Sequence, residues 1–123
     1  MIQPKQEDIT IYQGATFLNE YVWKSGKPPA PLDITNYTIR MQIRVHVSSK
    51  NVLVNLDNDT LGGITISDAL NGRFAVRIEA DKTDDIQIPQ SVYDIEAEAP
   101  DGTVTRLVEG RVTVSKQVTR SVN

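Results

Sequence analysis

The residues most able to do chemistry are few and lie apart along the chain. His46 is the sole histidine, and there is no cysteine. A general base needs a pocket, a nucleophile and an orienting partner, whereas His46 stands in an alternating polar row beside Arg44. We interpret His46 as a surface residue. We predict no catalytic residue, no cofactor and no enzymatic activity, and one histidine without cysteine also argues against a transition-metal site.

Two acidic clusters have the residue types of a metal site but not its spacing. Asp57-Asn58-Asp59 followed by Gly62-Gly63 resembles part of a calcium loop. The next alternate position is Leu61, however, and no bidentate glutamate closes the loop. A second acidic cluster lies at residues 81–85. We interpret both clusters as solvated turns and predict no metal site.

A row of polar side chains at residues 40–46 alternates with apolar ones. A strand would project Arg40 and Arg44 from one face, where they could bind an anionic sugar or another protein. The alternative is an ordinary solvated face whose charges pair with carboxylates on a neighbouring strand.

Trp23 lies directly before a proline-rich loop at residues 24–31. Its ring could stack on a carbohydrate or anchor a protein interface, or it could belong to the core. The loop is either a permissive surface or a contact arm. The candidate partner-docking residues are therefore Trp23, Lys24, Lys27, Pro28, Pro29, Arg40 and Arg44.

Composition favours one ordinary globular domain, residues 1–123. The 39% apolar and 24% charged fractions argue against disorder and membrane spanning, and no stretch approaches the ~20 apolar residues of a spanning helix. The net charge of −3 and the scattered basic residues make nucleic acid an unexpected partner. The N-terminus lacks the pattern of a secretion signal, so we expect synthesis in a cytoplasm.

Alternating apolar residues predict an all-β fold, an immunoglobulin-like antiparallel β-sandwich of about seven to nine short strands. Outside the final third, the predicted strands are 8–13, 16–23, 38–47, 51–57, 63–67 and 73–80. Asn71-Gly72 predicts a turn that joins the last two of these strands into a hairpin. We expect at most one helical turn, near residues 81–86, with Asp81 as its cap.

The final third reads as a β-hairpin around Pro100-Asp101-Gly102. A three-residue loop would place Glu96 opposite Arg106 and Ile95 opposite Leu107, whereas a two-residue loop would place Ile95 opposite Val108. We favour the first register because it pairs opposite charges and apolar residues.

Two residues of this hairpin carry further expectations. Gly110 interrupts the second strand and indicates a bulge or a close backbone approach. Tyr93 follows an Asp-containing turn and is similar to the tyrosine corner of immunoglobulin-like sandwiches, although Ile95 replaces the cysteine found there.

Residues 8–17, 23–28 and 32–44, together with the closing stretch 93–119, form a pattern that spans most of the chain. This pattern resembles small structural proteins of tailed bacteriophages, in particular the N-terminal domain of siphophage baseplate upper proteins. In that family a Gly-Thr-Phe start leads to a Leu-Thr-Gly-Tyr turn before a long strand. Asn36 stands where the glycine is usual, and asparagine is the next residue best able to adopt the left-handed backbone. No stalk or receptor-binding extension is present in these residues.

The resemblance implies a non-enzymatic virion component, made in the host cytoplasm, that docks on other virion proteins in a symmetric assembly. We expect a tail or baseplate component or adaptor. The alternatives are a capsid decoration protein and a carbohydrate-binding module. Strand edges, the proline loop and two candidate docking arms, residues 1–7 and 115–123, are the expected contact surfaces, and self-association is compatible with this role.

Overall fold

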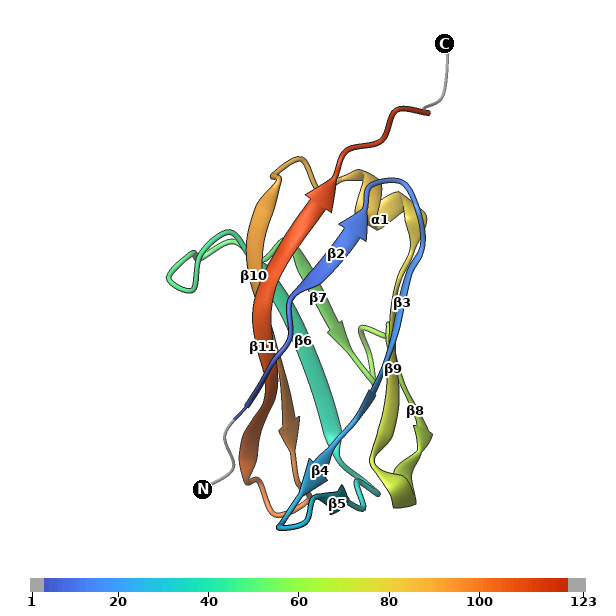
Figure 1. Cartoon of the computed structure of the whole chain (residues 1–123), viewed down its shortest axis with the longest axis vertical. Helices are drawn as coiled ribbons and strands as arrows, with labels where there is room; N and C mark the ends of the chain where they lie inside the picture. Colours follow the sequence, from blue (N-terminus) through green and yellow to red (C-terminus); the bar gives the residue numbers. More distant parts are fainter. Residues whose placement is uncertain (1–3, 120–123) are drawn as a thin grey trace.

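The computed structural model describes residues 4–119, which form two facing β-sheets (Figure 1). Eight strands in this range have four residues or more, within the predicted number: β2 (Ile9–Tyr12), β3 (Phe17–Val22), β6 (Thr38–Arg44), β7 (Val54–Asp57), β8 (Ile64–Asp68), β9 (Arg73–Ile78), β10 (Gln90–Glu98) and β11 (Val104–Ser115). Three more have two residues each: β1 (Lys5–Gln6), β4 (Lys24–Ser25) and β5 (Ala30–Pro31). The predicted all-β sandwich is confirmed.

The strand order is that of an immunoglobulin-like sandwich. One sheet has the order β1-β11-β10-β6-β7, with β2 also paired to β11, and the other has the order β3-β9-β8. β1 and β2 pair with β11 in parallel, whereas the remaining paired strands are antiparallel. No helix within residues 4–119 is long and apolar enough to cross a membrane.

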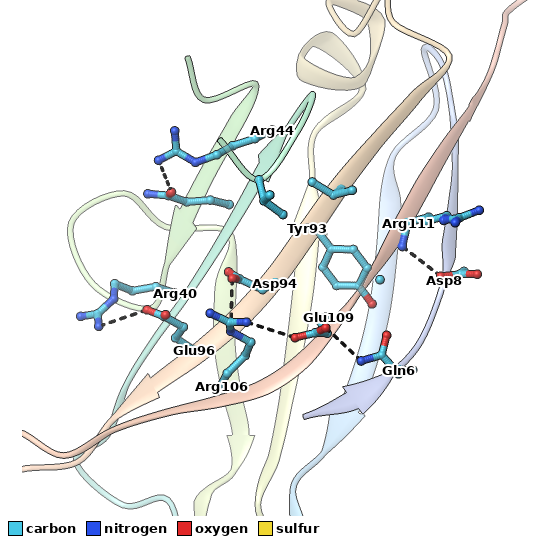
Figure 2. Close-up of a pocket in the computed structure, with 14 residues that line it drawn as sticks. Gln6, Asp8, Arg40, Arg44, Tyr93, Asp94, Glu96, Arg106, Glu109 and Arg111 are labelled. Carbon is cyan, nitrogen blue, oxygen red and sulfur yellow. Dashed lines mark hydrogen bonds and ion pairs between the residues drawn. The ribbon is translucent and has the colours of Figure 1, made fainter. Parts of the chain in front are cut away.

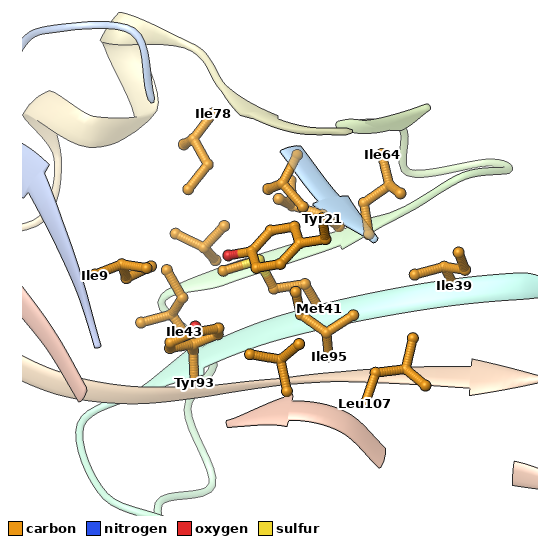
Figure 3. Close-up of a cluster of buried hydrophobic side chains, with 14 of the residues drawn as sticks. Ile9, Tyr21, Ile39, Met41, Ile43, Ile64, Ile78, Tyr93, Ile95 and Leu107 are labelled. Atoms are coloured by element: carbon orange, nitrogen blue, oxygen red, sulfur yellow. The ribbon is translucent and has the colours of Figure 1, made fainter. Parts of the chain in front are cut away.

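The core lies between the inner faces of the two sheets (Figure 3). Burial alternates along β6 as the sequence predicted, so Ile39, Met41 and Ile43 are fully buried. On the opposite sheet, β9 buries Phe74 and its apolar neighbours in the same alternation. The side chains at the other, alternate positions of β6 therefore point to the outer surface. The candidate site lies on that surface.

The closing hairpin combines both registers considered from the sequence. Gly102 has φ +90°, and its N–H donates to the Ala99 carbonyl at 2.9 Å, which confirms the three-residue loop. Glu96 pairs with Arg106, but the register then shifts by one residue, so that Ile95 faces Val108. The expected pairing of Ile95 with Leu107 was therefore wrong.

Leu107 is the extra residue of a β-bulge, and both Leu107 and Val108 are buried. Without the bulge, the alternation would turn Glu109 and Arg111 toward the core. The one-residue shift keeps these charged side chains outside and brings Val112 inward.

Gly110 marks the close backbone approach that the sequence predicted. A Cβ atom at this position would lie 2.2 Å from the Glu7 carbonyl oxygen. The hydroxyl of Tyr93 donates a hydrogen bond to that same oxygen. The expected tyrosine corner was wrong in its acceptor, because the hydroxyl bonds to the segment between β1 and β2 and not to the turn just before Tyr93.

Three local expectations need correction. β6 ends at Arg44 and not at Val47, because the chain turns there. The proline-rich loop contains the short β4–β5 ribbon. The helical turn α1 (Ala80–Asp84) is confirmed, but its N-cap position is Glu79 and not Asp81.

Two expectations about turns are confirmed. Asn36 adopts φ +65°, as its place in the turn requires. β8 and β9 form the predicted antiparallel hairpin, and Gly72 adopts a left-handed backbone before β9.

Candidate functional site

The outer face of β6, β10 and β11 brings many charged side chains together (Figure 2). The strand register places Arg40, Glu96 and Arg106 side by side at one level of the sheet. Asp57 on β7 lies at the same level, next to Arg40. Negative and positive residues therefore alternate across four neighbouring strands.

Ion pairs connect these strands. Arg40 lies 3.7 Å from the Glu96 carboxylate and 3.1 Å from that of Glu98. Arg106 lies 3.6 Å from Asp94 and 3.2 Å from Glu109. We call this group of six residues the charged face: Arg40, Asp94, Glu96, Glu98, Arg106 and Glu109.

The N-terminal segment extends the charged face beyond β11. The Gln6 side chain donates to the Glu109 carboxylate at 3.0 Å, and the Arg111 N–H donates to the Asp8 carboxylate at 2.9 Å. Residues 1–7 were predicted as a docking arm, but β1 within them is paired to β11. Residues 1–3 lie outside the described residues.

The electrostatic environment differs along the charged face. Partial burial raises the pKa of Asp94, and the neighbouring Glu96 carboxylate adds to this, although Arg106 opposes it. The hydrogen bond from Gln6 lowers the pKa of Glu109, and Arg106 acts in the same direction. Desolvation is therefore the largest influence on the pKa of Asp94, whereas hydrogen bonds dominate at Glu109.

Arg44 lies on the same face and binds the loop that follows β6. Its guanidinium donates to the carbonyl oxygens of Ser49 and Lys50 at 2.7 and 3.1 Å, and to the Gln42 side-chain oxygen at 2.8 Å. These contacts hold the loop that connects β6 to β7. Arg44 thus fixes a loop at the margin of the charged face.

The other chemistry-bearing residues are dispersed. His46 is exposed in the loop after β6. One Asp57 carboxylate oxygen accepts backbone N–H groups of Asp59, Leu61 and Gly62, which is the arrangement of a capped turn. Within residues 4–119, no group of three or more His, Cys, Asp or Glu side chains could hold a metal ion.

The predicted docking residues lie on different surfaces. Trp23 is only 8% exposed and packs edge-to-face on Tyr37, with ring centroids 5.8 Å apart, so it belongs to the core. Arg40 and Arg44 lie on the outer face of β6. The remaining four are exposed on or beside the β4–β5 ribbon at one end of the sandwich (Figure 1): Lys24, Lys27, Pro28 and Pro29.

The sequence did not place the carboxylates of β10 or the arginines of β11 in the candidate site. β6 and β10 are neighbours in the sheet although Arg40 and Glu98 are 58 positions apart. The available signal was charge complementarity, since the outward row of β6 is basic and that of β10 is acidic.

Comparison with known proteins adds no family to this description. No protein-family model matches the chain. No curated protein matches its sequence either.

Proposed function

We propose that this chain is a non-enzymatic structural protein of a tailed-phage virion, a tail or baseplate component or adaptor that docks on other virion proteins through its charged face. The observation that carries the docking role is the alternating order of Asp57, Arg40, Glu96 and Arg106 across four strands. The phage assignment rests on the sequence resemblance of residues 8–17, 23–28, 32–44 and 93–119.

The ion pairs of the charged face support docking because they order long side chains before a partner arrives. Arg40 and Arg106 are each held by two carboxylates, yet their side chains remain 37% and 52% exposed. Ordering them in advance reduces the entropy lost on binding. Arginine is also enriched at protein interfaces, and its planar group can bind a partner while keeping an internal contact.

The pattern also favours a partner of mixed charge. A surface of one sign would attract a strongly charged ligand, whereas alternating signs select a complementary pattern and fix its register. A protein surface offers such a pattern. A capsid decoration protein could dock through the same face. Localisation of the chain to the head or the tail of the particle is therefore decided by experiment.

The carbohydrate hypothesis loses its main support. It depended on Trp23 as a stacking platform and on the basic face of β6. The indole is buried, and the Arg40 guanidinium is paired with the Glu96 and Glu98 carboxylates. No sugar-binding role is therefore proposed.

Particle incorporation tests the proposal directly. Tagged wild-type chain and the Arg40→Glu variant would be expressed in the host during particle production, and the chain would be quantified in purified virions. Arg73→Glu is the matched control, because Arg73 is exposed on β9 of the other sheet. We expect wild type and Arg73→Glu in the particles, with Arg40→Glu reduced about tenfold or more.

Two results would count against the proposal in different ways. Absence of the wild-type chain from purified virions would refute the structural role. Equal incorporation of Arg40→Glu and Arg73→Glu, with both variants folded by circular dichroism, would refute docking through the charged face.

A further inference from the structure

The outer edge of β3 has backbone groups that pair with no strand of the described range 4–119. β3 pairs with β9 alone. Trp23 N–H donates to the Gly72 carbonyl at 2.9 Å, and antiparallel pairs alternate between bonded and non-bonded. Leu18, Glu20 and Val22 therefore direct their N–H and C=O groups away from β9, toward the open edge.

The side chains at this edge follow a simple pattern on the outer surface. Leu18 is 63% exposed, Glu20 is exposed and Val22 is half-buried. Glu20 makes no ion pair with any residue of the described part of the chain. On the outer side of this edge, an acidic residue therefore lies between two apolar residues. An added strand would contact these three side chains.

A hollow runs beside this edge, between β3 and the N-terminal segment around β1. Its floor includes Tyr21 and Trp23, whose hydroxyl and indole N–H are buried without a hydrogen-bond partner in the described residues. Lys5, Glu7 and Lys24 also line it. An added strand on β3 would extend over this hollow, and its inward side chains would have to be small.

The C-terminal segment has the pattern complementary to that edge. The chain extends beyond the end of β11 (Figure 1), and after Gln117 the side chain of Val118 is 91% exposed. From Val118 onward the sequence alternates Val118, Arg120 and Val122 with Thr119 and Ser121. One set is apolar, basic and apolar, and the other consists of small hydroxyl residues.

We propose that the C-terminal segment of one copy adds as an antiparallel strand to the β3 edge of a second copy. Arg120 then lies opposite Glu20, between Val118 opposite Val22 and Val122 opposite Leu18. This register pairs opposite charges at the centre and apolar residues on both sides. The small residues Thr119 and Ser121 face the hollow.

The position of Gln117 favours a second copy over the chain's own β3. Its N–H donates to the Gln13 side-chain oxygen at 3.1 Å, which holds the segment at the end of the sandwich. Binding its own edge would require a tight reversal just after Gln117, and residues 116–123 contain neither glycine nor proline. A tail on one surface and an edge on another give a head-to-tail contact, which closes into rings or extends into filaments.

Sedimentation velocity over a concentration series tests this contact. We expect the wild-type chain to associate and a chain ending at Gln117 to remain monomeric. Glu20→Lys and Arg120→Glu should each weaken association about tenfold, and the double variant Glu20→Lys/Arg120→Glu should restore it. Asp59→Lys, in an exposed turn, is the control for the charge change in Glu20→Lys.

A mixing experiment isolates the exchange between copies. Val22→Pro blocks the edge without removing a bond to β9, because the Val22 N–H points outward. The edge-blocked chain and the tail-less chain should each be monomeric alone and form a one-to-one complex when mixed. Association that survives tail removal, a double variant that fails to recover, or a wild-type chain that stays monomeric would each overturn the proposal.

Discussion

The hydroxyl of Tyr93 donates a hydrogen bond to the backbone carbonyl of Glu7, 86 positions earlier in the chain. This contact passes beside Gly110, where the absence of a side chain lets Glu7 approach β11. The N-terminal segment is thereby fixed at the junction between β1 and β2. Because Gln6 and Asp8 flank this point and bond to β11, the same contact supports one margin of the charged face.

Removing the Tyr93 hydroxyl tests how strongly it holds the N-terminal segment. Tyr93→Phe removes the hydrogen bond to the partly buried Glu7 carbonyl and should lower the free energy of unfolding by about 1–2 kcal/mol. Amide exchange at Glu7, whose N–H donates to the Glu109 carbonyl, and at Ile9 should become faster. Tyr12→Phe is the control, because Tyr12 is 63% exposed, and a urea titration should show almost no change for it. Equal effects of the two substitutions would contradict this account.

Stability should depend on pH through the same residue. Burial raises the pKa of Tyr93 above its usual value of 10.0, and the neighbouring Tyr21 adds to the rise. The folded protein then keeps a proton that the unfolded chain releases above about pH 10. The contribution of Tyr93 to stability should be constant below that pH and fall above it, by up to about 1.4 kcal/mol per pH unit.

Urea titrations between pH 8 and pH 11 measure this decline. Tyr93→Phe should show a shallower decline than wild type, with the remainder due partly to Tyr21, whose pKa burial also raises. An identical decline in both proteins would show that Tyr93 does not contribute.

Gly110 should tolerate no side chain. Its backbone is not left-handed, so Gly110→Ala introduces only the collision with the Glu7 carbonyl, and we expect a loss of about 1–3 kcal/mol. Gly62→Ala is the control that introduces backbone strain without a collision. Gly62 has φ +74°, and no atom lies near its Cβ position. Amide exchange at Glu7, whose N–H donates to the Glu109 carbonyl, should accelerate in Gly110→Ala alone. Acceleration in both variants would indicate general destabilisation.

Arg44 should control the loop between β6 and β7. Arg44→Ala removes three hydrogen bonds from the guanidinium, two of them to loop carbonyls, and should expose the loop to trypsin at Lys50. Arg73→Ala, on the other sheet, should leave cleavage unchanged. Comparison of cleavage rates at matched protease concentration measures the effect. Equal rates for the two variants would refute the anchoring role.

Local pattern predicted the elements that depend on neighbouring residues. The alternation of Ile39, Met41 and Ile43 was sufficient to predict β6 and its buried face. The turn at Gly102 and the left-handed Asn36 follow from backbone preferences that each residue type carries. These features need no knowledge of the rest of the chain.

Contacts between distant segments were not accessible in the same way. The register change at Leu107 depends on which residues of β11 face the opposite sheet and which face solvent. The adjacent apolar pair Leu107 and Val108 was the one sign of this bulge in the sequence. The parallel pairing of β1 with β11 left no local signal in Lys5–Gln6. The charged face was missed for the same reason, since it depends on β6 and β10 being neighbours.

Cryo-electron microscopy of the purified virion tests the central claim most directly. The account predicts density for this sandwich at symmetry-related positions, with the outer face of β6, β10 and β11 against a neighbouring protein and Arg40 inside the contact. A reconstruction that places the chain in the particle with this face open to solvent would contradict docking through the charged face. A particle without the chain would contradict the virion role itself.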